Sequence, residues 1–98
     1  MDDIEDEANI EAQIRQIASR LREEREKARI SQMDLSFQAG LSQNQVFCME
    51  TGKRIPNLYT LLKVCRALKI NPSVLFTPSV EERSQARETI IRLASKYI

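Results

Sequence analysis

Residues 32–50 read QMDLSFQAGLSQNQVFCME, and they are the part of the sequence that most clearly indicates the fold. It holds two short segments with apolar residues at helical spacing, separated by a turn at Gly40. Ser42 and Gln45 form a capping box that begins the second segment. Ala39 and Gly40 are small, so two helices can approach each other there at a steep angle. Two short helices joined by a tight turn that contains glycine form a helix-turn-helix unit.

Apolar spacing predicts another helix before this unit. Its apolar stripe recurs every three to four residues and consists of Ile10, Ile14, Ile17 and Leu21. We expect this helix to run to about Ala28. Ser31 is the expected N-cap of the next helix, in which Met33 and Leu35 are apolar positions. Gly40 is expected to end this helix in the left-handed conformation. The segment after the turn is expected to end in the same way, at Gly52.

Three further segments follow. Asn57 is the expected N-cap of a helix, and the positions expected to be buried in it are Leu58, Leu61, Leu62, Cys65 and Leu68. Asn71 and Pro72 begin a short fifth helical turn that ends at Phe76. A capping box of Ser79 and Glu82 begins a last helix. The expected fold class is all-α, with five helices and an additional C-terminal helix.

The composition excludes several classes of protein. The 98 residues include 2 Gly and 3 Pro, too few for the frequent turns of an all-β fold. There is no His and there are 2 Cys, which leaves no Cys-rich zinc site and no histidine base. No apolar run is long enough to span a membrane, and the acidic start is unlike a secretory signal. We expect a cytoplasmic protein that is not an enzyme, with no catalytic residues, metal, cofactor or small-molecule ligand.

The charges are sorted along the chain. Residues 1–12 hold six Asp and Glu and no Lys or Arg, whereas residues 13–98 hold 15 Lys and Arg against eight Asp and Glu. A basic body behind an acidic leader suggests a nucleic-acid partner. Ordinary surface lysines behind a solvated N-terminus explain the same pattern, and charge alone favours that reading. We divide the chain into an acidic extension (1–12), a helix-turn-helix domain (13–77) and a C-terminal helix (78–98).

The helix after the Gly40 turn carries a polar face. The residues expected to be exposed on it lie away from Val46 and Met49 and are Ser42, Gln43, Asn44, Gln45 and Cys48. Glutamine and asparagine amides can make paired hydrogen bonds with adenine in the major groove of DNA. Adjacent amides are also common at the exposed start of a helix. The residues alone leave these two interpretations open.

Residues from about Ile17 to Phe76 resemble the phage-repressor/Cro-like (Xre) helix-turn-helix family. The matching stretches are LREEREKARISQMDL, AGLSQNQVFCMETGKRIP and LYTLLKVCRALKINPSVLF. Together they cover about 60 of the 98 residues. The resemblance implies a five-helix repressor-like domain whose third helix enters the major groove of double-stranded DNA as part of a homodimer.

The resemblance also implies roles for individual residues. The residues expected to read bases are Ser42, Gln43, Asn44 and Cys48. Those expected to contact phosphates are Gln32, Lys53 and Arg54, with Gln32 packing beside Gln43. Arg25 and Glu50 are expected to pair across the first and third helices. The alternative for Arg25 is a solvated position in the charged run of the first helix, where partners three and four residues away are available.

Three positions depart from the family pattern. Arg29 stands where many members have glycine, so it is strained if the turn needs a positive φ. Phe47 replaces a residue that is usually small or polar, and it could touch a thymine methyl, pack on a neighbour or be exposed. Cys48 replaces what is often a long polar reader. We expect Cys48 to be exposed and Cys65 to be buried as a small apolar residue.

The last helix carries an apolar stripe that must cover something. Ala86, Ile90, Leu93 and Tyr97 share one face, which Ile91, Ala94 and Ile98 widen. The helix either folds back on its own domain or pairs with a second copy. We favour a dimer interface that includes Ile90, Leu93, Ala94 and Tyr97. The sequence therefore predicts a homodimeric, sequence-specific transcriptional regulator. The alternative is an antitoxin-like or adaptor module whose apolar C-terminal helix binds a partner protein.

Overall fold

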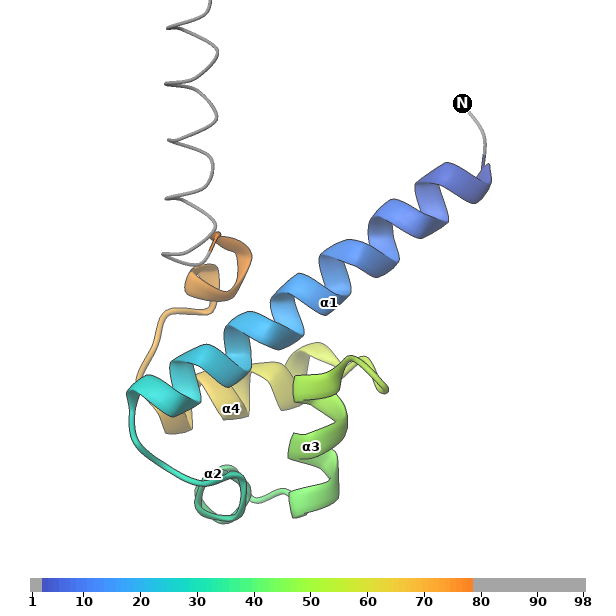
Figure 1. Cartoon of the computed structure of the whole chain (residues 1–98). Helices are drawn as coiled ribbons and strands as arrows, with labels where there is room; N and C mark the ends of the chain where they lie inside the picture. Colours follow the sequence, from blue (N-terminus) through green and yellow to red (C-terminus); the bar gives the residue numbers. More distant parts are fainter. Residues whose placement is uncertain (1–2, 79–98) are drawn as a thin grey trace, which may run out of the picture.

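The computed structural model describes residues 3–78, which form four α-helices and one short 3-10 helix (Figure 1). The elements are α1 (Asp3–Lys27), α2 (Gln32–Ala39), α3 (Gln43–Thr51), α4 (Leu58–Leu68) and η1 (Pro72–Phe76). No strand occurs within residues 3–78, so the all-α prediction is confirmed for this part of the chain. The fifth expected helix is a 3-10 helix of five residues, and the count of five α-helices is therefore not confirmed. The additional C-terminal helix lies outside the described residues.

The helices are arranged so that α1 spans the domain. α1 runs diagonally past α3 and α4, and its N-terminal half extends beyond the rest of the body (Figure 1). In the same view α2 is seen end-on while α3 lies in the plane, so the two helices cross at the steep angle expected from the Gly40 turn. α2 also contacts α4, and α1 contacts α3 and η1. This packing holds the helix-turn-helix unit, α2 and α3, at one end of the molecule.

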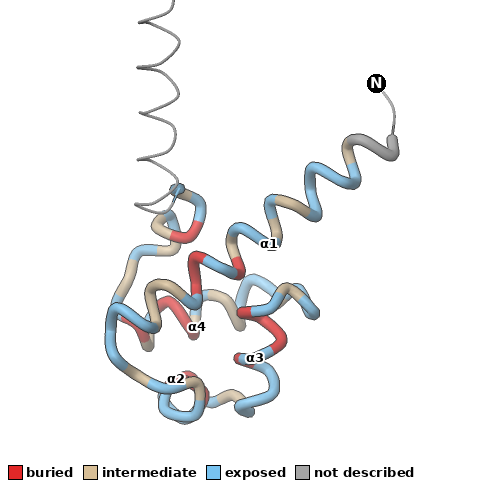
Figure 2. Tube along the Cα trace, in the orientation of Figure 1, coloured by how far each residue is buried: buried red, intermediate tan, exposed pale blue. Residues whose placement is uncertain are grey.

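The core takes one fully buried large side chain from every element. These side chains are at most 2% exposed and are Leu21, Leu35, Val46, Val64 and Leu75. The buried stretches of all elements face the centre of the domain (Figure 2). Fully burying one such side chain is worth about 1.5–3 kcal/mol. Because all five elements contribute to one cluster, the position of α3 depends on the whole domain.

Four of the predicted helix caps are confirmed, and the fifth, at Ser79, lies outside the described residues. The side chains of Ser31, Ser42, Asn57 and Asn71 each accept a hydrogen bond from a backbone N–H of the following turn, at 2.8–3.1 Å. Each bond satisfies a donor that has no partner within the helix. The local sequence therefore sets where α2, α3, α4 and η1 begin.

Four residues between helices adopt the left-handed conformation. Two of them are the predicted Gly40 (φ 69°) and Gly52 (φ 75°). The others are Arg29 (φ 59°) and Lys69 (φ 58°), which carry a side chain where glycine is favoured. The turn between α1 and α2 thus has the positive φ at which we expected Arg29 to be strained.

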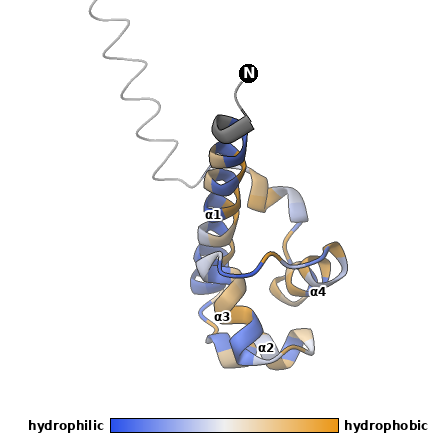
Figure 3. Cartoon of the chain, turned by 90° about the vertical axis from the view of Figure 1, so that its right-hand side faces the viewer, coloured by the Kyte–Doolittle hydropathy of each residue, from blue (hydrophilic) through white to orange (hydrophobic). Residues whose placement is uncertain are grey.

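Several apolar positions are more exposed than their spacing predicts. Met33, Leu58 and Leu62 are 62%, 70% and 44% exposed, and Ile10 is 55% exposed. In α4 the stripe that faces the core passes through Leu61, Val64, Cys65 and Leu68, which leaves Leu58 and Leu62 at its edge. Ile10 is exposed because its part of α1 lies beyond the body. Hydrophobic residues nevertheless follow the side of α1 that is turned toward α4 (Figure 3).

Candidate nucleic-acid interface

The N-terminal half of α3 is exposed and well defined. Ser42 Oγ accepts a hydrogen bond from the backbone N–H of Gln45 at 3.1 Å, and the Ser42 N–H donates to Gln45 Oε1 at 2.8 Å. This reciprocal capping box fixes the first turn of the helix. Gln43 and Asn44 follow directly and are exposed. The capping box thus uses the amide oxygen of Gln45 and leaves the side chains of Gln43 and Asn44 on the surface.

Cys48 was expected to be exposed, and that expectation is wrong. Cys48 is only 9% exposed, and its Sγ lies 3.9 Å from Asn44 Oδ1. The chain after α3 turns back onto the helix, where the backbone N–H of Arg54 donates to the Cys48 carbonyl at 3.2 Å. This return of the chain accompanies the burial of the C-terminal half of α3. Cys48 therefore does not belong to the exposed polar face.

Phe47 is the aromatic residue of the exposed face. It is 39% exposed, and Lys53 Nζ lies 5.0 Å from the centre of its ring. A cation at this distance is attracted by the ring face. The contact joins α3 to the loop that follows it. Sequence spacing does not indicate this contact, because it depends on how the loop folds back.

A shallow hollow joins the starts of α2 and α3. It has a volume of about 290 Å³ and is lined by Gln32, Gln43, Asn44 and Phe47. The structure thus brings Gln32 beside Gln43. Polar amides from two helices surround one surface depression next to an aromatic ring, which is a suitable arrangement for contacting the polar and methyl groups of base edges.

Arg25, Gln32 and Glu50 form one network across α1, α2 and α3. Arg25 donates to both carboxylate oxygens of Glu50, from Nε to Oε2 at 2.7 Å and from Nη2 to Oε1 at 3.0 Å. Gln32 Nε2 also donates to Glu50 Oε1, at 3.2 Å. The Glu50 side chain is 1% exposed and that of Arg25 is 11% exposed. The Arg25 guanidinium therefore balances the charge of the buried Glu50 carboxylate, and both carboxylate oxygens accept hydrogen bonds. A buried charge requires such partners.

The same arginine also secures the turn between α1 and α2. Arg25 Nη1 donates to the carbonyl of Ile30 at 2.8 Å. The hydrogen bonds with Glu50 raise the pKa of Arg25 above its ordinary value, although burial acts in the opposite direction. Arg25 thus stays charged and links the turn to the end of α3. Nothing in the sequence pattern indicates the bond between Gln32 and Glu50.

The two predicted phosphate contacts in the loop after α3 have different neighbours. Lys53 and Arg54 are both exposed. Lys53 lies against Phe47 of α3 and also lines a hollow beside α1. Arg54 lines a different hollow beside α1, together with Ile14 and Ile55. Gln32, the third predicted phosphate contact, uses one amide N–H on Glu50 and has a second N–H remaining.

Other kinds of site are not evident in the described part of the chain. Residues 3–78 contain no group of three or more potential metal ligands. Within the same range, no helix has the length and apolar character needed to cross a membrane. Cys65 is 1% exposed, as expected, and burial raises the pKa of its thiol.

The family model for helix-turn-helix proteins matches residues 21–75. This range holds α2, α3, α4, the Arg25–Glu50 pair and the whole candidate interface. The chain belongs to the Xre-like helix-turn-helix family. No curated protein matches it.

Two solved structures of helix-turn-helix proteins are similar to this chain. One is the restriction-modification controller protein C.AhdI from Aeromonas hydrophila, with 38% identity, a TM-score of 0.65, and coverage of 66% of this chain and 98% of that one. The other is the P22 c2 repressor in complex with a synthetic operator, with 28% identity, a TM-score of 0.59, and coverage of 64% and 96%. The family match and the similarity to these two proteins support one conclusion: this chain is a DNA-binding transcription regulator.

Proposed function

We propose that this protein is a sequence-specific, repressor-like regulator that binds double-stranded DNA as a homodimer with α3 in the major groove. The observation that carries the proposal is the division of α3 into two halves. Gln43 and Asn44 are exposed at its start, and Glu50 is buried at its end on Arg25. A helix held by its C-terminal half can present its N-terminal half to base edges without losing its anchor.

The chemistry of the exposed half suits direct readout. The amides of Gln43 and Asn44 can each donate and accept hydrogen bonds, which matches the N6 and N7 pattern of adenine. The Ser42 hydroxyl oxygen accepts from Gln45, and its hydrogen can still be donated to a base or phosphate. Phe47 adds an apolar edge that can contact a thymine methyl group. We therefore propose Ser42, Gln43, Asn44 and Phe47 as the reading surface.

Phosphate contacts would set the position of this surface. Lys53 and Arg54 supply two positive charges just after α3, and Gln32 supplies an amide N–H at the start of α2. Contacts of this kind add affinity on any sequence and fix the register of the protein on the duplex. The bond of Gln32 to Glu50 would couple this phosphate contact to the position of α3.

The proposed dimer would place two copies of α3 on related half-sites. Its interface is predicted to include Ile90, Leu93, Ala94 and Tyr97, which lie outside the described residues. Two recognition helices in successive major grooves are about 34 Å apart. Sedimentation of the wild type and of Ile90→Asp/Leu93→Asp tests this part. We expect a dimer that the substitutions convert to a monomer, and a wild-type monomer at tens of micromolar would contradict the proposal.

Selection of bound sequences from a random duplex library tests the readout. A single preferred sequence with two-fold symmetry is expected. On that sequence Gln43→Ala should cost about 1–3 kcal/mol and relax the base preference at one position of each half-site. Gln38→Ala is the matched control, because Gln38 is exposed on α2 outside the hollow. Equal loss in both variants, or none in Gln43→Ala, would refute the reading role of α3.

A further inference from the structure

The first turns of α1 form an arm that projects from the domain. We define the arm as residues 3–11, which extend beyond α3 and α4 (Figure 1). Ile10 lies on the arm and is 55% exposed, while Ile14, one turn closer to the body, is half-buried. All charged residues of the arm are acidic: Asp3, Glu5, Asp6, Glu7 and Glu11. Residues 3–78 thus leave most of the Ile10 side chain uncovered, on a helix of one sign of charge.

A second exposed surface lies on α4 and on the loop before it. Ile55, Leu58 and Leu62 are 70%, 70% and 44% exposed. Leu58 and Leu62 are one turn apart on the same edge of α4, and Arg66, which is exposed, follows after another turn. Residues 51–78 hold five Lys and Arg and no Asp or Glu. This α4 surface is therefore apolar at its start and basic beyond it.

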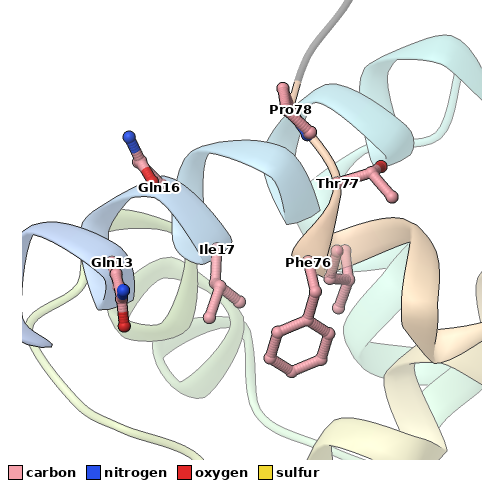
Figure 4. A pocket seen from close by; sticks show the side chains of 7 residues that line it. Gln13, Gln16, Ile17, Phe76, Thr77 and Pro78 are labelled. Atoms are coloured by element: carbon pink, nitrogen blue, oxygen red, sulfur yellow. The ribbon is translucent and has the colours of Figure 1, made fainter.

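The two surfaces meet at a hollow on the side of the domain where α1 faces α4 (Figure 3). The hollow has a volume of about 200 Å³, and its lining includes Ile14, Ile55, Leu61 and Phe76. A larger hollow, of about 720 Å³, continues along α1 at Ile17 and Phe76 (Figure 4). Neither hollow shares a lining residue with the one between α2 and α3. A continuous exposed apolar surface on a small domain is typical of a protein interface.

The order of residues along the two surfaces matches in opposite directions. Toward the N-terminus, the α1 series is Ile14, Ile10 and Asp6, in steps of four residues. Toward the C-terminus, the α4 series is Leu58, Leu62 and Arg66, in the same steps. Each series covers about 12 Å at about 1.5 Å per residue. Antiparallel packing of the arm on α4 therefore sets isoleucine against leucine twice and an aspartate beside an arginine.

The arm does not reach α4 of its own chain. A straight helix that leaves the domain at Ile14 carries Ile10 and Asp6 away from its own α4 (Figure 1). A second copy related by a two-fold axis can offer its α4 to the arm and receive the other arm in return. A stable interface removes about 800 Å² from each partner. Reciprocal exchange favours such an area, because each copy buries both its arm and its α4 surface.

We propose that the arm of each chain docks antiparallel on α4 of a second copy, so that two chains exchange acidic arms. Charge supports a second copy as the occupant, because an acidic arm and a basic α4 surface attract each other between copies. An arm against an arm, or α4 against α4, would instead bring like charges together. The inference rests on the proposed homodimer and adds a contact to the interface predicted at residues 90–97.

Charge reversal in the full-length chain tests the exchange. The arm variant is Asp6→Lys/Glu7→Lys, and the α4 variant is Arg66→Glu/Lys69→Glu. Each variant alone sets like charges against each other at both contacts of its dimer, so we expect its dissociation constant to rise about tenfold or more. In an equimolar mixture, the mixed dimer has opposite charges at both contacts. We therefore expect sedimentation of the mixture to show dimers as stable as those of the wild type.

Matched variants on α2 serve as controls. Asp34→Lys/Gln38→Lys adds positive charge at exposed positions outside the contact, and we expect no change in the dissociation constant. Leu58→Asn should weaken the dimer, because it removes apolar surface from the contact. Met33→Asn, at a residue that is 62% exposed on α2, should leave the dimer unchanged.

Two results would overturn the exchange while the homodimer stands. One is dimerisation of both charge variants as tightly as the wild type. The other is weakening of each variant without recovery in the mixture, which would show that the arm and α4 do not meet between copies. A wild-type monomer would contradict the proposed homodimer and this inference together. Assemblies larger than a dimer would exclude a closed exchange between two chains.

Discussion

Arg25 donates two hydrogen bonds to the carboxylate of Glu50, which lies 25 positions further along the chain. The pair joins α1 to the end of α3 and leaves the start of α3 exposed. A third bond from Arg25 to the Ile30 carbonyl brings the turn before α2 into the same network. One side chain therefore holds both helices of the helix-turn-helix unit relative to α1.

Removal of either partner of this pair should be costly. Arg25→Ala leaves the Glu50 carboxylate buried, with Gln32 as its remaining side-chain partner among residues 3–78. Glu50→Ala leaves a largely buried guanidinium. Each change should lower the free energy of unfolding by about 3–5 kcal/mol. The double variant should lose less than the sum, because the second substitution removes the stranded charge. Urea unfolding of the four proteins measures the coupling, and strict additivity would count against it.

Neutralisation of Lys53 and Arg54 should weaken binding to any duplex. We expect Lys53→Gln/Arg54→Gln to reduce affinity for the selected and for random sequences alike. The slope of log affinity against log salt should fall by about 0.9 for each phosphate that the variant no longer neutralises. Arg22→Gln/Lys27→Gln removes the same charge from exposed positions on α1 and is the control. A weakening restricted to the selected sequence, with an unchanged slope, would exclude this role.

Relief of the positive φ at Arg29 should stabilise the domain. Arg29 is exposed with φ of 59°, a conformation that costs a non-glycine residue about 1–2 kcal/mol relative to the right-handed one. We expect Arg29→Gly to raise the free energy of unfolding by up to about 1 kcal/mol, since the greater freedom of glycine in the unfolded chain offsets part of the gain. Gly40→Ala should have the opposite sign, because Gly40 has φ of 69°. Thermal melts compare the variants, and a destabilised Arg29→Gly protein would contradict the account.

Stability should fall in acid partly through Glu24. Burial raises the pKa of Glu24, but the hydrogen bond from Arg20 and the charges of Lys27 and Arg20 outweigh it, so the pKa lies below its ordinary value. The folded state therefore binds this proton less readily than the unfolded state. The stabilisation is present above the unfolded pKa and is lost as the pH falls through the folded pKa. Glu24→Gln should make the free energy of unfolding less dependent on pH in the acid range. Glu26→Gln, in an exposed pair with Arg22, should change this dependence less.

Features that depend on local chemistry were predictable from the sequence. The N-caps at Ser31, Ser42, Asn57 and Asn71 follow from residue type and position, because a capping bond spans two or three residues. The left-handed Gly40 and Gly52 follow for the same reason. The pairing of Arg25 with Glu50 came instead from the family resemblance, since nothing in the spacing of the two residues indicates it.

Features that depend on how distant segments meet were not predictable. Cys48 is buried where the chain after α3 folds back, and neither its spacing nor its polarity indicates that. Leu58 fits the helical stripe of α4 equally well but lies at its edge, because the core faces Val64 and Cys65. The bond of Gln32 to Glu50 requires the crossing angle of α2 and α3, which no residue encodes alone.

The division of α3 has a consequence for how such a protein can change over time. The residues that hold the helix in place, Val46, Met49 and Glu50, are buried, whereas Gln43 and Asn44 lie on the surface at its start. Substitutions at the two exposed positions disturb neither the core nor a buried charge, so their expected effect on folding is small. A gene duplicate could therefore acquire a new target sequence through one or two substitutions while its stability stayed almost constant.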